Sequence, residues 1–217
     1  GATVLEEIPE AAKERIAGAF QQISAFSVRD ANTRNLVAAL SEKTALDHLD
    51  PVLIGDFEKE LRETKLPEKL PDRYCVVYSY YNRIHKKEEI AAIRKFCKEH
   101  DLEIVTVGAP QMWVRNYLIL DPFEVLRVFA EADFVITDTF HGTIFSAKYA
   151  KRFATITRES NQNKLGDLIN RLGVQRHRIV SFEELNDVYP LEADRNRMLE
   201  VCRRERERSI QYLKDNL

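Results

Sequence analysis

A regular alternation of apolar, β-rich runs with amphipathic runs, beginning at Tyr74, constrains the fold of this chain more than any other feature. The predicted strands are YCVVYS (74–79), EIVTVG (103–108), DFVITD (133–138), RFATIT (152–157) and, as a fifth candidate, RIVSF (178–182). The predicted helices between them span 86–100, 121–132, 142–150 and 163–173. This alternation predicts an α/β fold, with a Rossmann-like parallel sheet that carries helices on both faces.

Two of these helices have clear end signals. Asp121, Pro122 and Glu124 occupy the N-cap, N1 and N3 positions of a capping box, which predicts the start of helix 121–132. Gly173 predicts the end of helix 163–173. A last, highly charged segment (194–217) is predicted to form one long C-terminal helix.

The part of the chain before Tyr74 is less regular. We predict a helix from Pro9 through Ala19, a strand at Ile23–Val28, a helix at 29–43 and a short strand that ends in a turn at 45–55. Residues 57–73 contain two prolines and no sustained apolar face, so they are predicted to connect two units.

The composition excludes several classes of function. The formal net charge is −2, so nothing global favours nucleic acid or an anionic membrane. No apolar run approaches the roughly 18 residues of a transmembrane helix. Neither GxxxxGK[ST] nor GxGxxG occurs, which argues against a nucleotide held by a glycine-rich loop. Cys75, Cys97 and Cys202 lie outside metal-binding spacings, so we predict structural thiols, no metal and no cofactor.

The segment FVITDTFHGTIFSAKYA (134–150) joins a predicted strand to a predicted helix, with His141, Gly142 and Thr143 at the corner. Ligands of open parallel sheets bind beyond the carboxyl ends of the strands. We expect Gly142 to let the backbone approach a ligand, and the amides of 142–144 to be free for a phosphate or carboxylate. Thr143 adds a hydroxyl, and His141 adds a side chain that titrates near neutral pH.

A purely structural interpretation of this corner stays open. Asp138 or Thr139 would then cap the helix, and His141 would hydrogen-bond within the core. Two further loops mix aromatic residues with arginine: SYYNRIHKK (79–87) and APQMWVRNY (109–117). They suit contact with a sugar or a phosphate, or else they serve only to hold the loops in place.

The segment from Asp121 to Ile156 resembles the polysaccharide pyruvyl transferase family, in which an apolar strand leads into Thr-Asp-Ser-Phe-His-Gly-Thr. Thr139 stands where Ser is usual, and a branch of the family has Arg there. ISAFSVRD (23–30) resembles the family's Ser-Val-Arg segment, and LDPVLI (49–54) its Asp-Pro segment. NQNKLGDLINRLGV (161–174) resembles the segment in which a basic residue precedes a leucine pattern.

The resemblance implies two Rossmann-like halves around a cleft, similar to GT-B glycosyltransferases. Residues 1–55 would then be the remnant of the N-terminal half and 56–73 a linker. Residues 74–217 would form the donor-binding C-terminal half, whose last helix crosses back. Most of the N-terminal half would be absent, so catalysis would depend on that half, or on a second chain, to complete the cleft.

The family's reaction moves a pyruvyl group from phosphoenolpyruvate onto two hydroxyls of a sugar, forming a ketal and releasing phosphate. The resemblance implies His141 as the catalytic residue. It implies as donor- or phosphate-binding residues Arg29, Thr139, Gly142, Thr143 and Lys164. The implied partners are phosphoenolpyruvate and a saccharide acceptor of a bacterial exopolysaccharide. The implied location is the cytoplasm, with peripheral contact to the inner membrane as a second option.

The two implied cations also have plain interpretations. Arg29 directly follows a predicted strand, at the end that faces a cleft, but it also suits a surface pair with Asp30. Lys164 lies in the first turn of a helix, where a cation opposes the helix dipole, which fits use on a bound anion. A solvated lysine is the alternative.

Two competing functions share these features. One is a GT-B glycosyltransferase domain that binds a nucleotide-sugar, although the chain lacks a clear acidic residue for a ribose after a glycine turn. The other is a non-catalytic binding module of the same ancestry.

Overall fold

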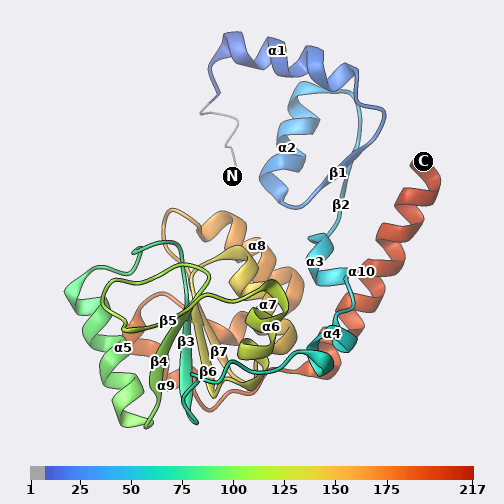
Figure 1. Ribbon diagram of the computed structural model, residues 1–217. Helices are drawn as coiled ribbons and strands as arrows, with labels where there is room; N and C mark the ends of the chain where they lie inside the picture. Colours follow the sequence, from blue (N-terminus) through green and yellow to red (C-terminus); the bar gives the residue numbers. More distant parts are fainter. Residues whose placement is uncertain (1–7) are drawn as a thin grey trace.

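The computed structural model describes residues 8–217 and contains two parallel sheets (Figure 1). The larger sheet has the strand order β5-β4-β3-β6-β7-β8, and every pair in it is parallel. Its strands are β3 (Tyr74–Tyr78), β4 (Glu103–Val107), β5 (Asn116–Leu118), β6 (Phe134–Thr137), β7 (Phe153–Ile156) and β8 (Arg178–Ile179). The predicted α/β class and parallel sheet are confirmed. The short edge strand β5 lies where we predicted a loop.

Helices cover both faces of this sheet, which is why its central strands read as continuous apolar runs. One face packs Val76, Val105 and Val135 against α6 (Pro122–Glu131), α7 (Phe140–Tyr149), α8 (Gln162–Leu172) and the start of α10 (Arg195–Asn216). The other face packs Val77 and Ile136 against α5 (Lys87–Glu99) and α9 (Leu185–Val188). Both strand faces are therefore core, and function is confined to the ends of the sheet.

The predicted helix-end signals are present. The Asp121 carboxylate accepts from the amides of Phe123 and Glu124, and the Glu124 side chain completes the capping box. Gly173 ends α8 in the left-handed region, at φ +73°. Cys75 and Cys97 are buried, as structural thiols usually are, whereas Cys202 is half-buried.

The smaller sheet pairs β1 (Phe26–Val28) with β2 (Ala45–Asp47). It is accompanied by α1 (Glu10–Gln21) and α2 (Ala31–Leu40). The first seven residues of the predicted unit 1–55 lie outside the described residues. The short strand predicted at the start of 45–55 is β2, but where we predicted a turn, Pro51–Ile54 forms helix α3. Asp50 caps this helix by accepting from the Val52 amide, and Pro51 occupies its first turn.

The connection after α3 also contains structure. Residues 57–73 include α4 (Glu58–Glu63). Its Leu61 is buried with Leu126 and Tyr149 of the larger unit. A single buried leucine gives no apolar periodicity, and for this reason the sequence favoured an unstructured connection.

The small unit lies beside the larger sheet, with α10 running alongside both (Figure 1). Arg171 of α8 donates to the Arg29 carbonyl oxygen at 3.0 Å. Arg208 of α10 donates to the Asp47 carbonyl oxygen, also at 3.0 Å. The His48 ring lies 4.8 Å from the Tyr212 ring of α10. Burial lowers the pKa of His48, as does the nearby Arg208 charge, so this contact favours the neutral imidazole.

Candidate functional site

The helix that carries His141 begins earlier than predicted. Helix α7 starts at Phe140, with Thr139 as its N-cap. The Thr139 hydroxyl accepts from the Gly142 amide at 2.9 Å, and the Thr139 carbonyl oxygen accepts from the Thr143 amide at 3.0 Å. The prediction that the Gly142 and Thr143 amides are free for an anion is therefore wrong. Among residues 8–217, the amides at this helix start that have no hydrogen-bond partner are those of Phe140 and His141.

Gly142 and Thr143 serve the packing of this corner. A Cβ on Gly142 would lie 2.1 Å from Thr137 Oγ1 and 2.8 Å from Tyr78 Cδ1. The close approach that demands glycine is thus to the protein's own strand rather than to a ligand. Thr143 is buried, and its hydroxyl donates to the Thr139 carbonyl oxygen at 2.9 Å.

His141 and Arg29 converge on a carboxylate that was not predicted as a site residue. Asp50 lies at the start of α3, and its side chain is 4% exposed. It accepts a hydrogen bond from Arg29, and His141 Nε2 lies 3.6 Å from Asp50 Oδ2. The His141 side chain is 51% exposed, so it is not the buried core histidine of the structural alternative. The small sheet and the large unit therefore both contribute to this cluster.

Phe140 brings the second predicted cation to the same place. Lys164 Nζ lies 4.6 Å from the centre of the Phe140 ring, and the Arg29 guanidinium carbon lies 5.8 Å from it. Both cations face a ring whose π-electrons attract positive charge. Lys164 forms no ion pair with any residue in 8–217, so its charge is not neutralised by a protein carboxylate.

A buried ionic network supports the other side of the corner. Asp138, directly after β6, has a fully buried side chain. Its carboxylate lies 3.1 Å from Arg83 Nε and 3.1 Å from Arg158 Nε, and it accepts from Ser79 Oγ at 2.6 Å. Burial alone would lower the pKa of Arg158. The hydrogen bond and the charge of Glu89 raise this pKa, and those of Asp138 raise it further. Arg158 therefore stays charged.

These groups border a cavity of about 400 Å³ at the carboxyl ends of β3, β6 and β7. Two cations, Arg83 and Lys164, line it, together with the Phe140 ring. The other lining residues are Tyr80, Asp138, Glu159, Ser160, Asn161, Asn163 and Leu165. A polar, cation-bearing cavity of this size suits a small anionic ligand.

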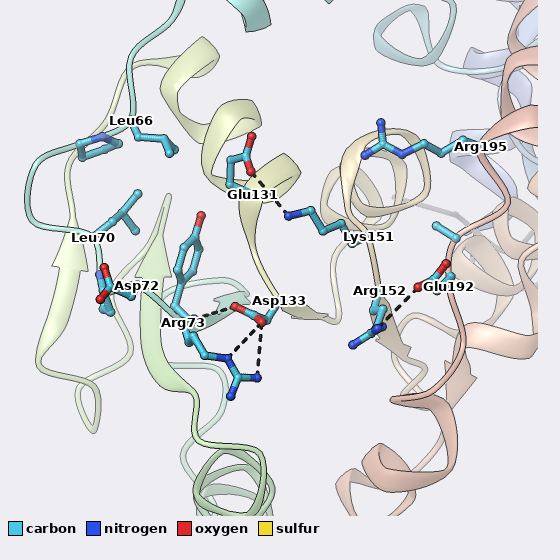
Figure 2. Close-up of a pocket in the computed structure, with 14 residues that line it drawn as sticks. Leu66, Leu70, Asp72, Arg73, Glu131, Asp133, Lys151, Arg152, Glu192 and Arg195 are labelled. Carbon is cyan, nitrogen blue, oxygen red and sulfur yellow. Dashed lines mark hydrogen bonds and ion pairs between the residues drawn. The ribbon is translucent and has the colours of Figure 1, made fainter.

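A larger hollow, of about 830 Å³, lies at the opposite end of the sheet (Figure 2). Its basic side chains already have partners. Arg73 pairs with Asp133 at 3.4 Å, Lys151 with Glu131 at 3.5 Å, and Arg152 with Glu192 at 3.5 Å. Arg195 donates to the Tyr149 carbonyl oxygen at 2.9 Å. Despite its volume, this hollow offers less unneutralised charge to a ligand.

The structure thus brings together Arg29, His141 and Lys164, while Thr139, Gly142 and Thr143 hold the helix start behind them. Sequence reasoning missed Asp50 and Asp138 as members of the site, whereas Arg83 belongs to the loop 79–87 that was suggested for contact with a sugar or a phosphate. For Asp50, the signal was its place in an Asp-Pro helix start. For Asp138, it was its position directly after a strand of a parallel sheet.

Two general features complete the description. Among residues 8–217, no helix has both the length and the apolar character needed to cross a membrane. Within the same residues, no three His, Cys, Asp or Glu side chains are grouped as metal ligands would be.

The sequence was compared with known protein families and with curated proteins. Residues 1–160 match the family described as polysaccharide pyruvyl transferase. The matched range includes Arg29, Asp50, Asp138 and His141, whereas Lys164 follows it. A search of curated proteins finds no match to this chain. The family match covers well over half of the sequence and agrees with the resemblance carried by the Thr-Phe-His-Gly segment, and the chain therefore belongs to the polysaccharide pyruvyl transferase family.

Proposed function

We propose that this chain provides the donor site of a transferase that moves a pyruvyl group from phosphoenolpyruvate onto two hydroxyls of a saccharide. The observation that carries the proposal is the convergence of Arg29, His141 and Lys164 around Phe140 and the buried Asp50. The donor carries a phosphate and a carboxylate, so its site needs more than one positive group.

The cluster supplies positive groups of two kinds. Lys164 and the unpartnered amides of Phe140 and His141 suit one anionic group of the donor, because the start of α7 also presents the positive end of its dipole. Arg29 suits the other group, since a guanidinium has five N–H donors and Asp50 occupies only part of them.

His141 is the proton carrier in this proposal. As the first sugar hydroxyl adds to the central carbon of phosphoenolpyruvate, the methylene carbon takes a proton from His141 and becomes a methyl group. The proton of that hydroxyl restores His141. The second hydroxyl then displaces phosphate, and its proton leaves with the phosphate. Asp50 is a positioning residue: at 3.6 Å it is too far for a hydrogen bond but close enough to orient the ring by charge.

Calorimetric titration of the whole chain with phosphoenolpyruvate tests the proposal. We expect His141→Ala to weaken binding about ten- to a hundredfold, or roughly 1.5–3 kcal/mol, because a donor to an anion is lost. The matched control is His100→Ala, since His100 lies just before β4, at the opposite end of the sheet, and hydrogen-bonds Asn186. This control should bind like the wild type.

Three results would contradict the proposal in different ways. Unchanged binding by His141→Ala would remove His141 from the donor site. Tighter binding of a nucleotide-sugar than of phosphoenolpyruvate would favour the glycosyltransferase alternative. Binding of neither ligand would favour a non-catalytic module.

A further inference from the structure

Two chemically different pairs of residues line the cavity at the carboxyl ends of the strands. In one pair, Lys164 faces the Phe140 ring. In the other pair, the Arg83 guanidinium carbon lies 5.4 Å from the centre of the Tyr80 ring, and Arg83 Nη2 donates to Ser160 Oγ at 3.0 Å. The first pair suits the anionic donor, while the second offers an aromatic surface that the donor does not need.

Tyr80 is exposed yet held in place. Its side chain lines the cavity and the residue is 59% exposed. The buried Gln111 donates to the Tyr80 carbonyl oxygen at 2.8 Å and accepts from the Ile84 amide at 3.2 Å. Asn82 adopts a left-handed conformation, with φ +43°, and its amide donates to the Pro110 carbonyl oxygen at 3.1 Å. A loop fixed in this way presents its aromatic ring at a low entropic cost of binding.

Polar groups with free hydrogen-bonding capacity lie on the rim of the same cavity. Glu159 and Asn163 line it and are exposed. Neither side chain hydrogen-bonds any residue in 8–217. By contrast, the Asn161 side chain is occupied, because it donates to the Asp138 carbonyl oxygen and accepts from the Arg158 amide. A carboxylate and an amide provide acceptors and donors for hydroxyl groups.

We propose that Tyr80, Glu159 and Asn163 form the acceptor subsite and bind a pyranose ring of the saccharide. A pyranose has an apolar face of C–H groups, which packs on the Tyr80 ring, and hydroxyls at its edge, which bind Glu159 and Asn163. The site rests on the proposed function, because it places the sugar hydroxyls in a cavity that is also lined by Lys164 and Phe140 of the proposed donor site.

Saturation-transfer NMR on the whole chain tests the subsite, with and without phosphoenolpyruvate. The probes are the methyl glycosides of β-galactose, β-glucose and β-mannose, three pyranoses that differ in the orientation of their hydroxyls. We expect wild-type chain to bind at least one of them. Tyr80→Ala should weaken that binding about three- to tenfold through loss of the aromatic surface. Glu159→Gln should weaken it through loss of the charged acceptor.

Tyr81→Ala is the matched control. Tyr81 is the next residue and is similarly exposed, at 66%, but its hydroxyl donates to Met112 Sδ at 3.8 Å, outside the cavity. Its loss should leave sugar binding unchanged. An equal loss in both tyrosine variants, or no loss in Tyr80→Ala, overturns the subsite, as does failure of the wild type to bind any of the three sugars.

The same variants separate this inference from the donor proposal. Tyr80→Ala should bind phosphoenolpyruvate as the wild type does in calorimetry. Donor binding without any sugar binding would overturn the subsite alone. Sugar binding that depends on Tyr80, without donor binding, would overturn the proposed function and leave a saccharide site.

Discussion

The two ends of the six-stranded sheet both gather arginine, lysine and carboxylate side chains, but they are built differently. At the amino end, each basic residue around the 830 Å³ hollow has its own partner, and most of these pairs reach solvent (Figure 2). At the carboxyl end, Asp50 and Asp138 are buried and each faces two basic groups, while Lys164 pairs with no carboxylate among residues 8–217. Burial and unbalanced charge, rather than volume, therefore distinguish the candidate site.

The largest expected effect compares a buried carboxylate with an exposed one. Asp138→Ala should cost about 3–5 kcal/mol of unfolding free energy, because it leaves Arg83 and Arg158 without their buried partner. Glu192→Ala, at the amino end, should cost at most about 1 kcal/mol, since Glu192 is 76% exposed. Urea denaturation measures both. Equal losses of unfolding free energy in the two variants would show that a buried carboxylate at the carboxyl end contributes no more than an exposed one at the amino end.

Close packing behind His141 gives the next effect. Gly142→Ala should cost about 1–3 kcal/mol of unfolding free energy, because its Cβ would overlap Thr137 Oγ1 and the Tyr78 ring. Gly166→Ala, within α8, is the control: no atom lies within 4 Å of the new Cβ, and alanine favours the helix by roughly 0.5–1 kcal/mol. Thermal melting would show the contrast. A Gly142→Ala variant with unchanged stability would show that the corner can relax and that its packing does not require glycine.

The unpaired lysine gives a smaller effect, on binding. Lys164→Met should weaken phosphoenolpyruvate binding roughly tenfold, or about 1.4 kcal/mol, by removing one charged contact. Lys151→Met removes the same charge from the amino end, where Lys151 already pairs with Glu131. Calorimetric titration should show no change for that variant. A similar loss in both would indicate a general effect of net charge rather than a local site.

The smallest effect concerns stability and pH at the amino end. His177 precedes β8, stacks on Phe153 at 4.1 Å, and its Nδ1–H donates to the Phe153 carbonyl oxygen at 3.1 Å. Burial lowers the pKa of His177, and the Arg176 charge adds to this although the Phe153 hydrogen bond opposes it. Below the ordinary histidine pKa of about 6.5, the unfolded chain therefore binds more protons than the folded chain does. The contribution of His177 to the unfolding free energy is present above that pH and is lost as the pH falls.

Denaturation of wild type and His177→Gln at pH 7.5 and 5.5 checks this sign. The wild type should lose more unfolding free energy between the two pH values than the variant does. An equal loss would show that His177 does not cause the pH dependence.

Much of the large sheet could be predicted because its central strands are buried on both faces and several of its helices, such as α5, α6 and α8, have a clear apolar stripe. Tyr74–Tyr78 and Phe134–Thr137 are continuous apolar runs, and Asp121 and Gly173 mark helix ends by local chemistry. The edge strand Asn116–Leu118 could not be predicted, because a strand of three residues, two of them exposed, carries no periodic signal. Helix α7 was placed late because Phe140 and His141 have weak helix preferences, which the Thr139 cap overrides.

The site was harder to predict, because its partners are distant in sequence. His141 and Lys164 could be singled out by motif and position, but nothing local pairs Asp50 with His141, or Arg83 with Asp138. These contacts depend on how the small sheet docks and on which loops follow neighbouring parallel strands. Trp113 likewise has a partner that is distant in sequence, because its Nε1–H donates to the Ile84 carbonyl oxygen at 2.8 Å.

The division of this cluster between two sheets makes ligand affinity and docking linked equilibria. Arg29 directly follows β1 of the small sheet and Asp50 begins α3, whereas His141 and Lys164 belong to the large unit. A ligand that contacts both strengthens docking by RT ln(1 + [L]/Kd). By reciprocity, whatever loosens Arg208 and Tyr212 from residues 47 and 48 weakens the ligand by the same factor. Helix α10 contacts the small unit through Arg208 and Tyr212, so changes in this helix that loosen the docking are expected to lower the affinity for a ligand that it does not touch.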